Sequence, residues 1–383
     1  MSSVSLRREP AYSTNPRREF WLKEAGSISN LTVASGIQTK QDLFFPLRGA
    51  GRMLSFLLRS SRKVRPWHGS FISSSRRSKH MSFAYLAFTQ AGAAAMTIRP
   101  ANLASGISTT RLPTGEAIPS LGQGTWGMAE DARHRKDEIA ALRVGFDLGM
   151  TLVDTAEMYA DGGAEALVGE AIAGRRDELF VVSKVLPENA TRPGTVDACE
   201  RSLRRLGTDR LDLYLLHWRG NVPLEETLDA FAALVDSGKI RYWGVSNFDV
   251  VDMIELWGPA AGAEVATDQV LYNLTRRGIE YDLLPWCRNR NIPIMAYSPI
   301  EQGRLLGHKE LKNVAARHDA KPAQVALAWL LRQDGVVAIP KAANVAHVRE
   351  NHAASALRLT RDDLAALDRA FPAPTEPTPL AML

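Results

Sequence analysis

The sequence has little cysteine and no long apolar run, and each shortage excludes a class of protein. Cys199 and Cys287 are the two cysteines of the 383 residues. A disulfide framework or a thiolate metal site is therefore not expected; we expect no bound metal, and a reducing compartment such as the cytoplasm fits. No run of about 20 strongly apolar residues occurs, so we expect no segment that spans a membrane.

Most of the chain has no net positive charge. Residues 1–95 hold 15 of the 47 Lys+Arg and 4 of the 42 Asp+Glu, a net of +11, whereas the remainder has a net of −6. Because the excess is confined to one terminal segment, it does not indicate a basic folded surface. We expect neither a nucleic-acid nor a membrane partner, although a basic arm that binds nucleic acid stays open as an alternative.

Residues 1–95 are rich in Ser and Arg and show no sustained period of 2 or 3.6. Such a composition is typical of disorder, so the fold is expected over residues 105–383. The stretch "RRSKHMSFAYLAFTQAGAAAM" has some features of a signal peptide, but it lies far from Met1. Three origins stay open for the segment: a start placed too far upstream with Met96 as the true start, a targeting or low-complexity extension, and a functional basic arm.

From about Leu112 the chain alternates short apolar runs with amphipathic helical stretches, several of which end in glycine. The runs expected to be strands are residues 120–126, 151–154, 179–184, 211–217, 240–246, 266–270, 292–298 and 336–340. Apolar strands joined by helices indicate a parallel sheet that is covered on its faces. Eight repeats predict a single-domain α/β fold, the closed (β/α)8 TIM barrel.

Six of these strands end in side chains that can ionise or form hydrogen bonds. They end in Asp154, Lys184, His217, Ser246–Asn247, Gln269 and Tyr297–Ser298. Ligands of such barrels bind at the carboxyl ends of the strands. The sequence therefore predicts a functional site where these six ends meet.

The stretch "GQGTWG" from Gly122 to Gly127 fits the G-x-G-x-x-G spacing of a Rossmann dinucleotide loop. A Rossmann loop turns directly into a helix, whereas Trp126 and a polar segment follow here. We interpret the stretch as the end of the first barrel strand. A Rossmann dehydrogenase, with the cofactor at these glycines, is the competing interpretation.

Four polar residues near successive strand ends suggest chemistry on a carbonyl group. Tyr159 follows Asp154 by five positions, and its phenol is a poor acid with an ordinary pKa of about 10. The ammonium of Lys184 would favour the phenolate and lower that pKa, with Asp154 pairing and orienting the lysine. His217 would donate a hydrogen bond to the substrate oxygen. Taken singly, the tyrosine fits a surface position and the Asp–Lys pair fits a structural ion pair.

Residues 112–380 resemble the aldo-keto reductases. The resemblance rests on "DTAEMYADGGAEALVGEAI", "VVSKV", "LDLYLLHW", "GKIRYWGVSNF", "YSP" and "IPKAANVAHVREN", in this order. The segments "ADGGAE", "DLLPWC" and "PAPTEPTPLAML" are most similar to the small bacterial members that reduce methylglyoxal and other aldehydes. The resemblance implies an NADPH-dependent reductase of aldehydes and ketones, with Tyr159 as general acid, Lys184 and Asp154 tuning it, and His217 orienting the carbonyl.

The resemblance also implies a cofactor site. Ser246, Asn247 and Gln269 match the residues that hold the nicotinamide carboxamide, and Tyr297 matches the aromatic ring that stacks on the nicotinamide. The remaining matches are Thr125 and Asp154 near the ribose, Ser298 and Ile300 at the pyrophosphate, Lys341 and His347 at the 2′-phosphate, and Glu350 and Asn351 at the adenine.

Two positions at the phosphate end depart from the family pattern. Ala342 stands where a hydroxyl residue is frequent, and His347 stands where an arginine pairs with the phosphate. A guanidinium is always charged and bidentate, whereas an imidazole is mostly neutral at pH 7. We expect NADPH to be preferred over NADH, but less strongly than in members with the arginine, unless Arg349 compensates.

The substrate pocket is expected between Trp126, Trp218, Tyr159 and His217, because aromatic walls suit small or flat carbonyls. A monomer is favoured. The family also includes catalytically quiet NADP(H)-binding regulatory subunits of membrane channels, and this alternative to an enzyme stays open.

Overall fold

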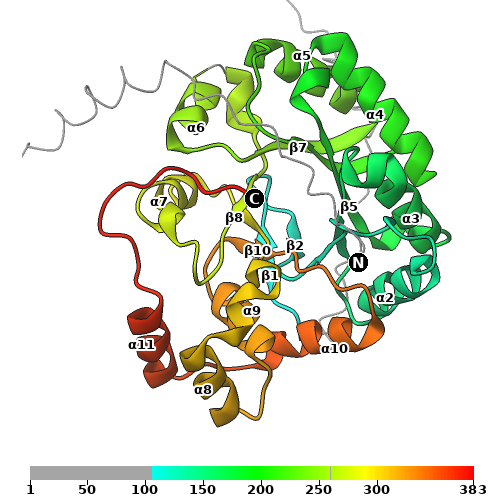
Figure 1. The fold of residues 1–383 in the computed structure, drawn as a ribbon. Helices are drawn as coiled ribbons and strands as arrows, with labels where there is room; N and C mark the ends of the chain where they lie inside the picture. Colours follow the sequence, from blue (N-terminus) through cyan, green and yellow to red (C-terminus); the bar gives the residue numbers. More distant parts are fainter. Residues whose placement is uncertain (1–105, 259) are drawn as a thin grey trace, which may run out of the picture. The chain divides into compact units, whose positions relative to one another are not determined.

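A computed structural model describes residues 106–258 and 260–383, drawn in colour in Figure 1. The expected extension 1–95 lies outside these residues.

Eight parallel strands form the central sheet, in the spatial order β10-β9-β8-β7-β6-β5-β4-β3. The strands are β3 Gln123–Gly124, β4 Leu152–Asp154, β5 Phe180–Val185, β6 Leu211–Leu216, β7 Ile240–Ser246, β8 Asp268–Leu271, β9 Ile294–Tyr297 and β10 Val336–Ala338. Parallel bridges join Leu121 to Ala338 and Gly124 to Lys341, so the first and last strands also meet and the sheet closes. All eight predicted strands are present, and the predicted barrel is confirmed.

Helices connect the strands and surround them as an outer ring (Figure 1). They are α2 Arg135–Asp147, α3 Gly163–Ile172, α4 Arg192–Leu206, α5 Leu224–Asp236, α6 Val250–Trp257, α7 Leu283–Arg288, α8 Lys309–Arg317, α9 Pro322–Leu331, α10 Val345–Ala353 and α11 Arg361–Ala370. Short 3₁₀ turns are η2 Tyr159–Gly162, η3 Arg176–Glu178, η4 Pro187–Asn189, η5 Ala260–Glu264, η6 Gly278–Glu280, η7 Glu301–Gly307 and η8 Ala354–Ala356. None of the described helices is long and apolar enough to cross a bilayer.

Local sequence explains where these helices begin and end. The Thr191 hydroxyl accepts a hydrogen bond from the Gly194 N–H at the start of α4, which ends at Gly207 in the left-handed conformation. Asp249 and Asp252 form a reciprocal capping box at the start of α6.

The apolar residues divide into two cores because successive strand side chains point to opposite faces. Inside the barrel, the core contains Leu152, Phe180, Val182, Leu213, Leu215, Met295 and Val337. Between the strands and the helices, the larger core contains their strand neighbours, among them Val153, Val181, Tyr214 and Ala338. This alternation decides which polar side chains can enter the barrel mouth.

An antiparallel hairpin, which the sequence analysis missed, covers the other end of the barrel. Strands β1 Thr109–Arg111 and β2 Ala117–Pro119 pair with each other, and Leu112 and Ile118 belong to the core inside the barrel. The Thr110 hydroxyl donates a hydrogen bond to the carbonyl of Val336 at the start of β10. The hairpin therefore closes the amino-terminal end and leaves the carboxyl-terminal end for ligands.

Two glycines of "GQGTWG", Gly122 and Gly124, allow neighbouring strands to approach closely. A Cβ atom on Gly124 would lie 2.7 Å from the carbonyl oxygen of Ile339, and one on Gly122 would lie 2.5 Å from the Leu152 side chain. Only glycine allows the strands to approach this closely. The interpretation of this stretch as a barrel strand is confirmed.

Candidate active site

Strand alternation brings three predicted site residues to the mouth of the barrel. In β4 and β5, Leu152, Phe180 and Val182 line the interior, so Asp154 and Lys184, each two residues further along, point the same way. His217 follows the last residue of β6 and is 7% exposed. Two strands continue past the polar residue predicted at their end. β5 continues one residue past Lys184, to Val185, and β8 continues two residues past Gln269, to Leu271.

Lys184 is the centre of the site, with no exposed surface. Its Nζ donates hydrogen bonds to Asp154 Oδ2 at 2.8 Å, to the Thr155 carbonyl at 2.9 Å and to the Tyr159 hydroxyl at 3.1 Å. A buried ammonium is stable only when it is paired and fully hydrogen-bonded. The charge of Lys184 is therefore held against the tyrosine hydroxyl.

Burial and charge act in opposite directions on this pair. Burial raises the pKa of Tyr159 above its ordinary value, and the Lys184 charge lowers it by less. The expectation of a lowered tyrosine pKa was therefore wrong for this geometry, because removal from water disfavours the phenolate more than the ammonium favours it. Burial also opposes the charge on Lys184, but Asp154 and Tyr159 outweigh it and its pKa is raised.

His217 completes the predicted group of four. Its ring centroid lies 5.8 Å from that of Tyr159, with the two planes at 74°. Burial, followed by the nearby Lys184 charge, holds the pKa of His217 well below its ordinary value. The imidazole is neutral at physiological pH and carries one N–H donor, and its Nδ1 has no hydrogen-bond partner among the described residues.

The four residues matched to the nicotinamide form one connected network beside this group. Gln269 Nε2 donates to Asp154 Oδ1 at 2.8 Å, and the Gln269 carbonyl accepts from Ser246 Oγ at 2.8 Å. Asn247 Nδ2 donates to the His217 carbonyl at 3.1 Å and to Ser246 Oγ at 3.2 Å, and the Tyr297 hydroxyl donates to Asn247 Oδ1 at 2.9 Å. The network joins the neutral amide and hydroxyl groups to the charged pair.

Thr125, matched to the ribose, follows strand β3, and Ser298 and Ile300, matched to the pyrophosphate, follow β9. The buried Thr125 hydroxyl donates to the Asp154 carbonyl at 3.0 Å. Ser298 has a φ of 49°, and its carbonyl accepts from Asn273 Nδ2 at 3.0 Å. Ile300 precedes η7 and packs against the outer core.

The residues matched to the phosphate and adenine lie after β10 and on α10. Lys341 and His347 are exposed, Glu350 is half-buried and Asn351 is buried. His347 is in the first turn of α10, where its N–H donates to Asn344 Oδ1 at 2.9 Å.

The two tryptophans expected at the substrate pocket each follow a strand by two residues, Trp126 after β3 and Trp218 after β6. Trp126 is 56% exposed, and the half-buried Trp218 has its ring centroid 4.8 Å from that of His217.

Three further polar residues close to the site were not predicted. Thr155 supplies a carbonyl to Lys184, and its buried Oγ1 has no partner among the described residues. Asn273 follows β8 and holds the Ser298 loop; the same search for polar residues after strands would have found it. Glu157, in the loop before Tyr159, has no signal in the sequence beyond its polarity.

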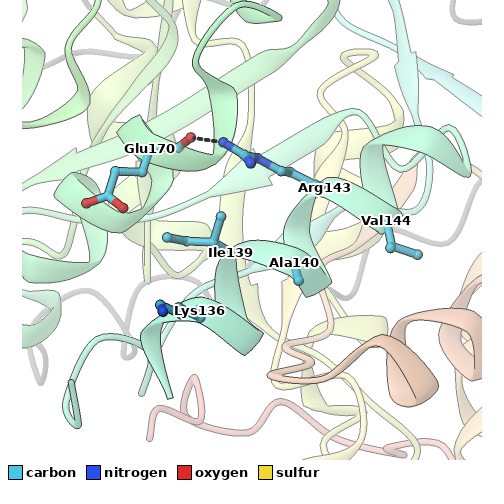
Figure 2. Close-up of a pocket in the computed structure, with 6 residues that line it drawn as sticks. All are labelled: Lys136, Ile139, Ala140, Arg143, Val144 and Glu170. Atoms are coloured by element: carbon cyan, nitrogen blue, oxygen red, sulfur yellow. Dashed lines mark hydrogen bonds between the residues drawn. The ribbon is translucent and has the colours of Figure 1, made fainter. Parts of the chain in front are cut away.

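A groove elsewhere on the barrel does not compete with this site. It has a volume of about 490 Å³ and lies between α2 and α3 on the outer surface, lined by Lys136, Ile139, Ala140, Arg143, Val144 and Glu170 (Figure 2). Arg143 spans it and donates to the Glu170 carbonyl at 2.7 Å. None of its lining residues is among the predicted site residues.

The chain is similar to proteins of known family over the whole barrel. The aldo/keto reductase family model matches residues 120–371. The methylglyoxal reductase YeaE of Escherichia coli K12 is 55% identical over 272 residues, which are 70% of this chain and 96% of that protein. An aldo/keto reductase of Klebsiella pneumoniae, crystallised with NADP and acetate, is 52% identical with a TM-score of 0.71 over 72% of this chain and 99% of that one. The thermostable aldo-keto reductase Tm1743, crystallised with epalrestat, is 41% identical with a TM-score of 0.65 over 69% and 99%. The chain belongs to the aldo/keto reductase family of oxidoreductases.

Proposed function

We propose that this protein reduces small aldehydes and ketones with NADPH, and that methylglyoxal represents its substrates. The proposal is supported by its similarity to an enzyme named methylglyoxal reductase and to an enzyme crystallised with NADP. The observation that carries it is the position of Lys184 Nζ, within hydrogen-bond distance of both the Asp154 carboxylate and the Tyr159 hydroxyl.

The residues beside this group fit a nicotinamide. Ser246, Asn247 and Gln269 offer neutral donors and acceptors that suit a carboxamide, and Tyr297 offers a flat ring for stacking. Bound NADPH would supply the hydride that reduces the carbonyl carbon. At the far end, Lys341 and His347 would hold the 2′-phosphate, with the weaker preference over NADH that a histidine in place of arginine implies.

In this mechanism, Tyr159 donates its proton to the carbonyl oxygen. Its raised pKa keeps the phenol protonated at neutral pH, so the proton is present when the substrate binds. The ammonium of Lys184 stabilises the phenolate that remains, and Asp154 holds that ammonium in place. The neutral His217 donates a hydrogen bond that orients the carbonyl, next to the indole of Trp218.

NADPH oxidation by the purified full chain, followed with a panel of aldehydes that includes methylglyoxal, tests the proposal. We expect substrate-dependent loss of NADPH absorbance and a lower rate with NADH. Absence of turnover with every aldehyde, while NADPH still binds, would instead favour the catalytically quiet regulatory barrel. The complete group of four side chains argues for the enzyme.

A further inference from the structure

Glu157 places a carboxylate in the loop that carries Tyr159. The residue lies three positions after Asp154 and two before Tyr159, and only 7% of its side-chain surface is exposed. A carboxylate this buried needs hydrogen bonds or an ion pair to be stable. Its partners therefore indicate what the residue does.

All of the side-chain partners of Glu157 that the structure shows lie beyond Lys184. Its Oε1 accepts hydrogen bonds from the Leu186 N–H at 2.8 Å and from Asn189 Nδ2 at 2.9 Å. Its Oε2 lies 3.6 Å from a guanidinium nitrogen of Arg201 on α4. Leu186 directly follows β5, and Asn189 ends η4. One carboxylate thus joins the tyrosine loop to the segment that follows the lysine strand.

The distance between these two segments determines whether the Tyr159 hydroxyl contacts the Lys184 ammonium. Lys184 is fixed by its strand, whereas Tyr159 is on a loop and its own N–H bonds within that loop, to the Ala156 carbonyl at 3.1 Å. Beyond it, Ala160 and Asp161 have φ values of 50° and 52°, so the chain turns sharply away. Backbone hydrogen bonds tie the start of the loop to β5, from the Thr155 N–H to the Val182 carbonyl at 2.9 Å and from the Glu157 N–H to the Lys184 carbonyl at 3.4 Å. The Glu157 carboxylate adds the link to the segment that follows β5.

We infer that Glu157 is a positioning residue, a carboxylate clamp that sets the Tyr159 hydroxyl against Lys184 Nζ by tying the two loops together. The inference rests on the proposed function, because it assigns Glu157 to the same proton transfer. Loss of the clamp should let the phenol move away from the ammonium while the cofactor contacts on β7, β8 and β9 remain. A displacement of about 1 Å at such a site can cost about 100-fold in rate.

Asp212 provides a control that also contacts β5, from the neighbouring strand β6. It is likewise buried, accepts the Val181 N–H at 2.8 Å and pairs with arginines, but it lies near the start of β6, at the closed end of the barrel. A carboxylate that merely stabilises the fold should behave like Asp212. A clamp should affect catalysis separately from stability.

The experiment compares E157A, E157Q, N189A and D212N in the full chain. For each, we would measure kcat, KM, NADPH binding by fluorescence titration, thermal stability, and hydrogen exchange of the amides in residues 155–159 and 186–189. We expect E157A to lower kcat by on the order of 10–100-fold with NADPH affinity nearly unchanged. Its exchange should be faster in both segments.

Two variants sharpen the result. E157Q keeps an Oε1 acceptor and loses only the long ion pair, so kcat should recover to within about threefold of the parent. N189A removes one of the two hydrogen bonds to Oε1, so it tests the clamp even if E157A does not fold. It should lower kcat less than E157A does, with faster hydrogen exchange at residues 155–159. D212N should lower thermal stability without changing kcat or exchange in these segments.

Unchanged exchange in E157A and N189A, or a loss of kcat in D212N as large as in E157A, would overturn the clamp. If the parent oxidises no NADPH with any aldehyde, the proposed function fails. Faster exchange in the two segments would still support the clamp in that case, so the two failures are distinguishable.

Discussion

The two ends of the barrel both bury a carboxylate beside cations, but they use the charges differently. At the closed end, Asp212 accepts from the Val181 N–H and pairs with Arg176 and Arg241 at 2.7 and 3.0 Å. Arg241 also pairs with Glu116 of the hairpin loop at 2.6 Å. Charges and donors are matched there, as expected of a structural network.

At the open end, some buried polar groups have no hydrogen-bond partner among the described residues. Lys184 pairs with the Asp154 carboxylate and donates another hydrogen bond to the neutral phenol of Tyr159. The buried His217 Nδ1 and Thr155 Oγ1 have no partner among the described residues. Buried oxygens of Tyr214 and Asp268 also lack a partner among the described residues, so such atoms are not confined to the active site. At the active site, a bound ligand could pair with them. The comparison indicates that polar residues stabilise one end of the barrel and are available for chemistry at the other.

The largest effect is expected from Tyr159→Phe at the open end. The substitution removes the acidic proton and keeps the ring, so carbonyl reduction should fall by about 10²–10⁴-fold. NADPH binding, measured by fluorescence titration, should stay within about twofold, because the ring remains and the hydrogen bond to Lys184 alone is lost. A variant that reduces aldehydes at the parental rate would show that the proton comes from another group.

At the closed end, Asp212→Ala should act on stability alone. It leaves the Val181 N–H and two partly buried arginines without their carboxylate, which should cost about 2–4 kcal/mol in the free energy of unfolding. Chemical denaturation measures the loss, and kcat of the folded variant serves as the control. A comparable drop in kcat would contradict the functional separation of the two ends.

Lys341→Ala tests the proposed 2′-phosphate site at the open end of the barrel. Loss of a charged contact to the 2′-phosphate should weaken NADPH binding by about 10-fold and leave NADH binding nearly unchanged. Replacing His347 with arginine should act in the opposite direction and tighten NADPH selectively. Equal losses for both cofactors in Lys341→Ala would exclude a role for this residue at the 2′-phosphate.

The smallest effect is expected from pH. In the proposed mechanism, reduction needs the protonated phenol, and because the pKa of Tyr159 is raised, the proton is lost only as pH rises past the ordinary value of about 10. His217 has a lowered pKa and stays neutral down to acidic pH. Measured kcat for reduction should therefore vary little between about pH 7 and 9. A steep fall within this range would indicate that the lysine charge dominates over burial when ligands are bound.

Much of the site could be predicted because barrel geometry is regular. Given eight parallel strands, side chains at their ends must converge, and Asp154, Lys184, His217 and Gln269 do so. The hairpin β1–β2 could not be predicted in this way, because two three-residue strands have too little periodicity to stand out from loops. Glu157 was missed because its partners, Leu186 and Asn189, are about 30 positions away and share no pattern with it.

The sequence alone sets the order of strands and helices and the chemistry of the residues after each strand. It also carries the resemblance to a reductase family. The sign of the pKa shift at Tyr159, the closed amino-terminal end and the link through Glu157 depend on distances between residues far apart in sequence. Burial and Coulomb interactions sum over all neighbours in space, and their balance exists only once the barrel has formed.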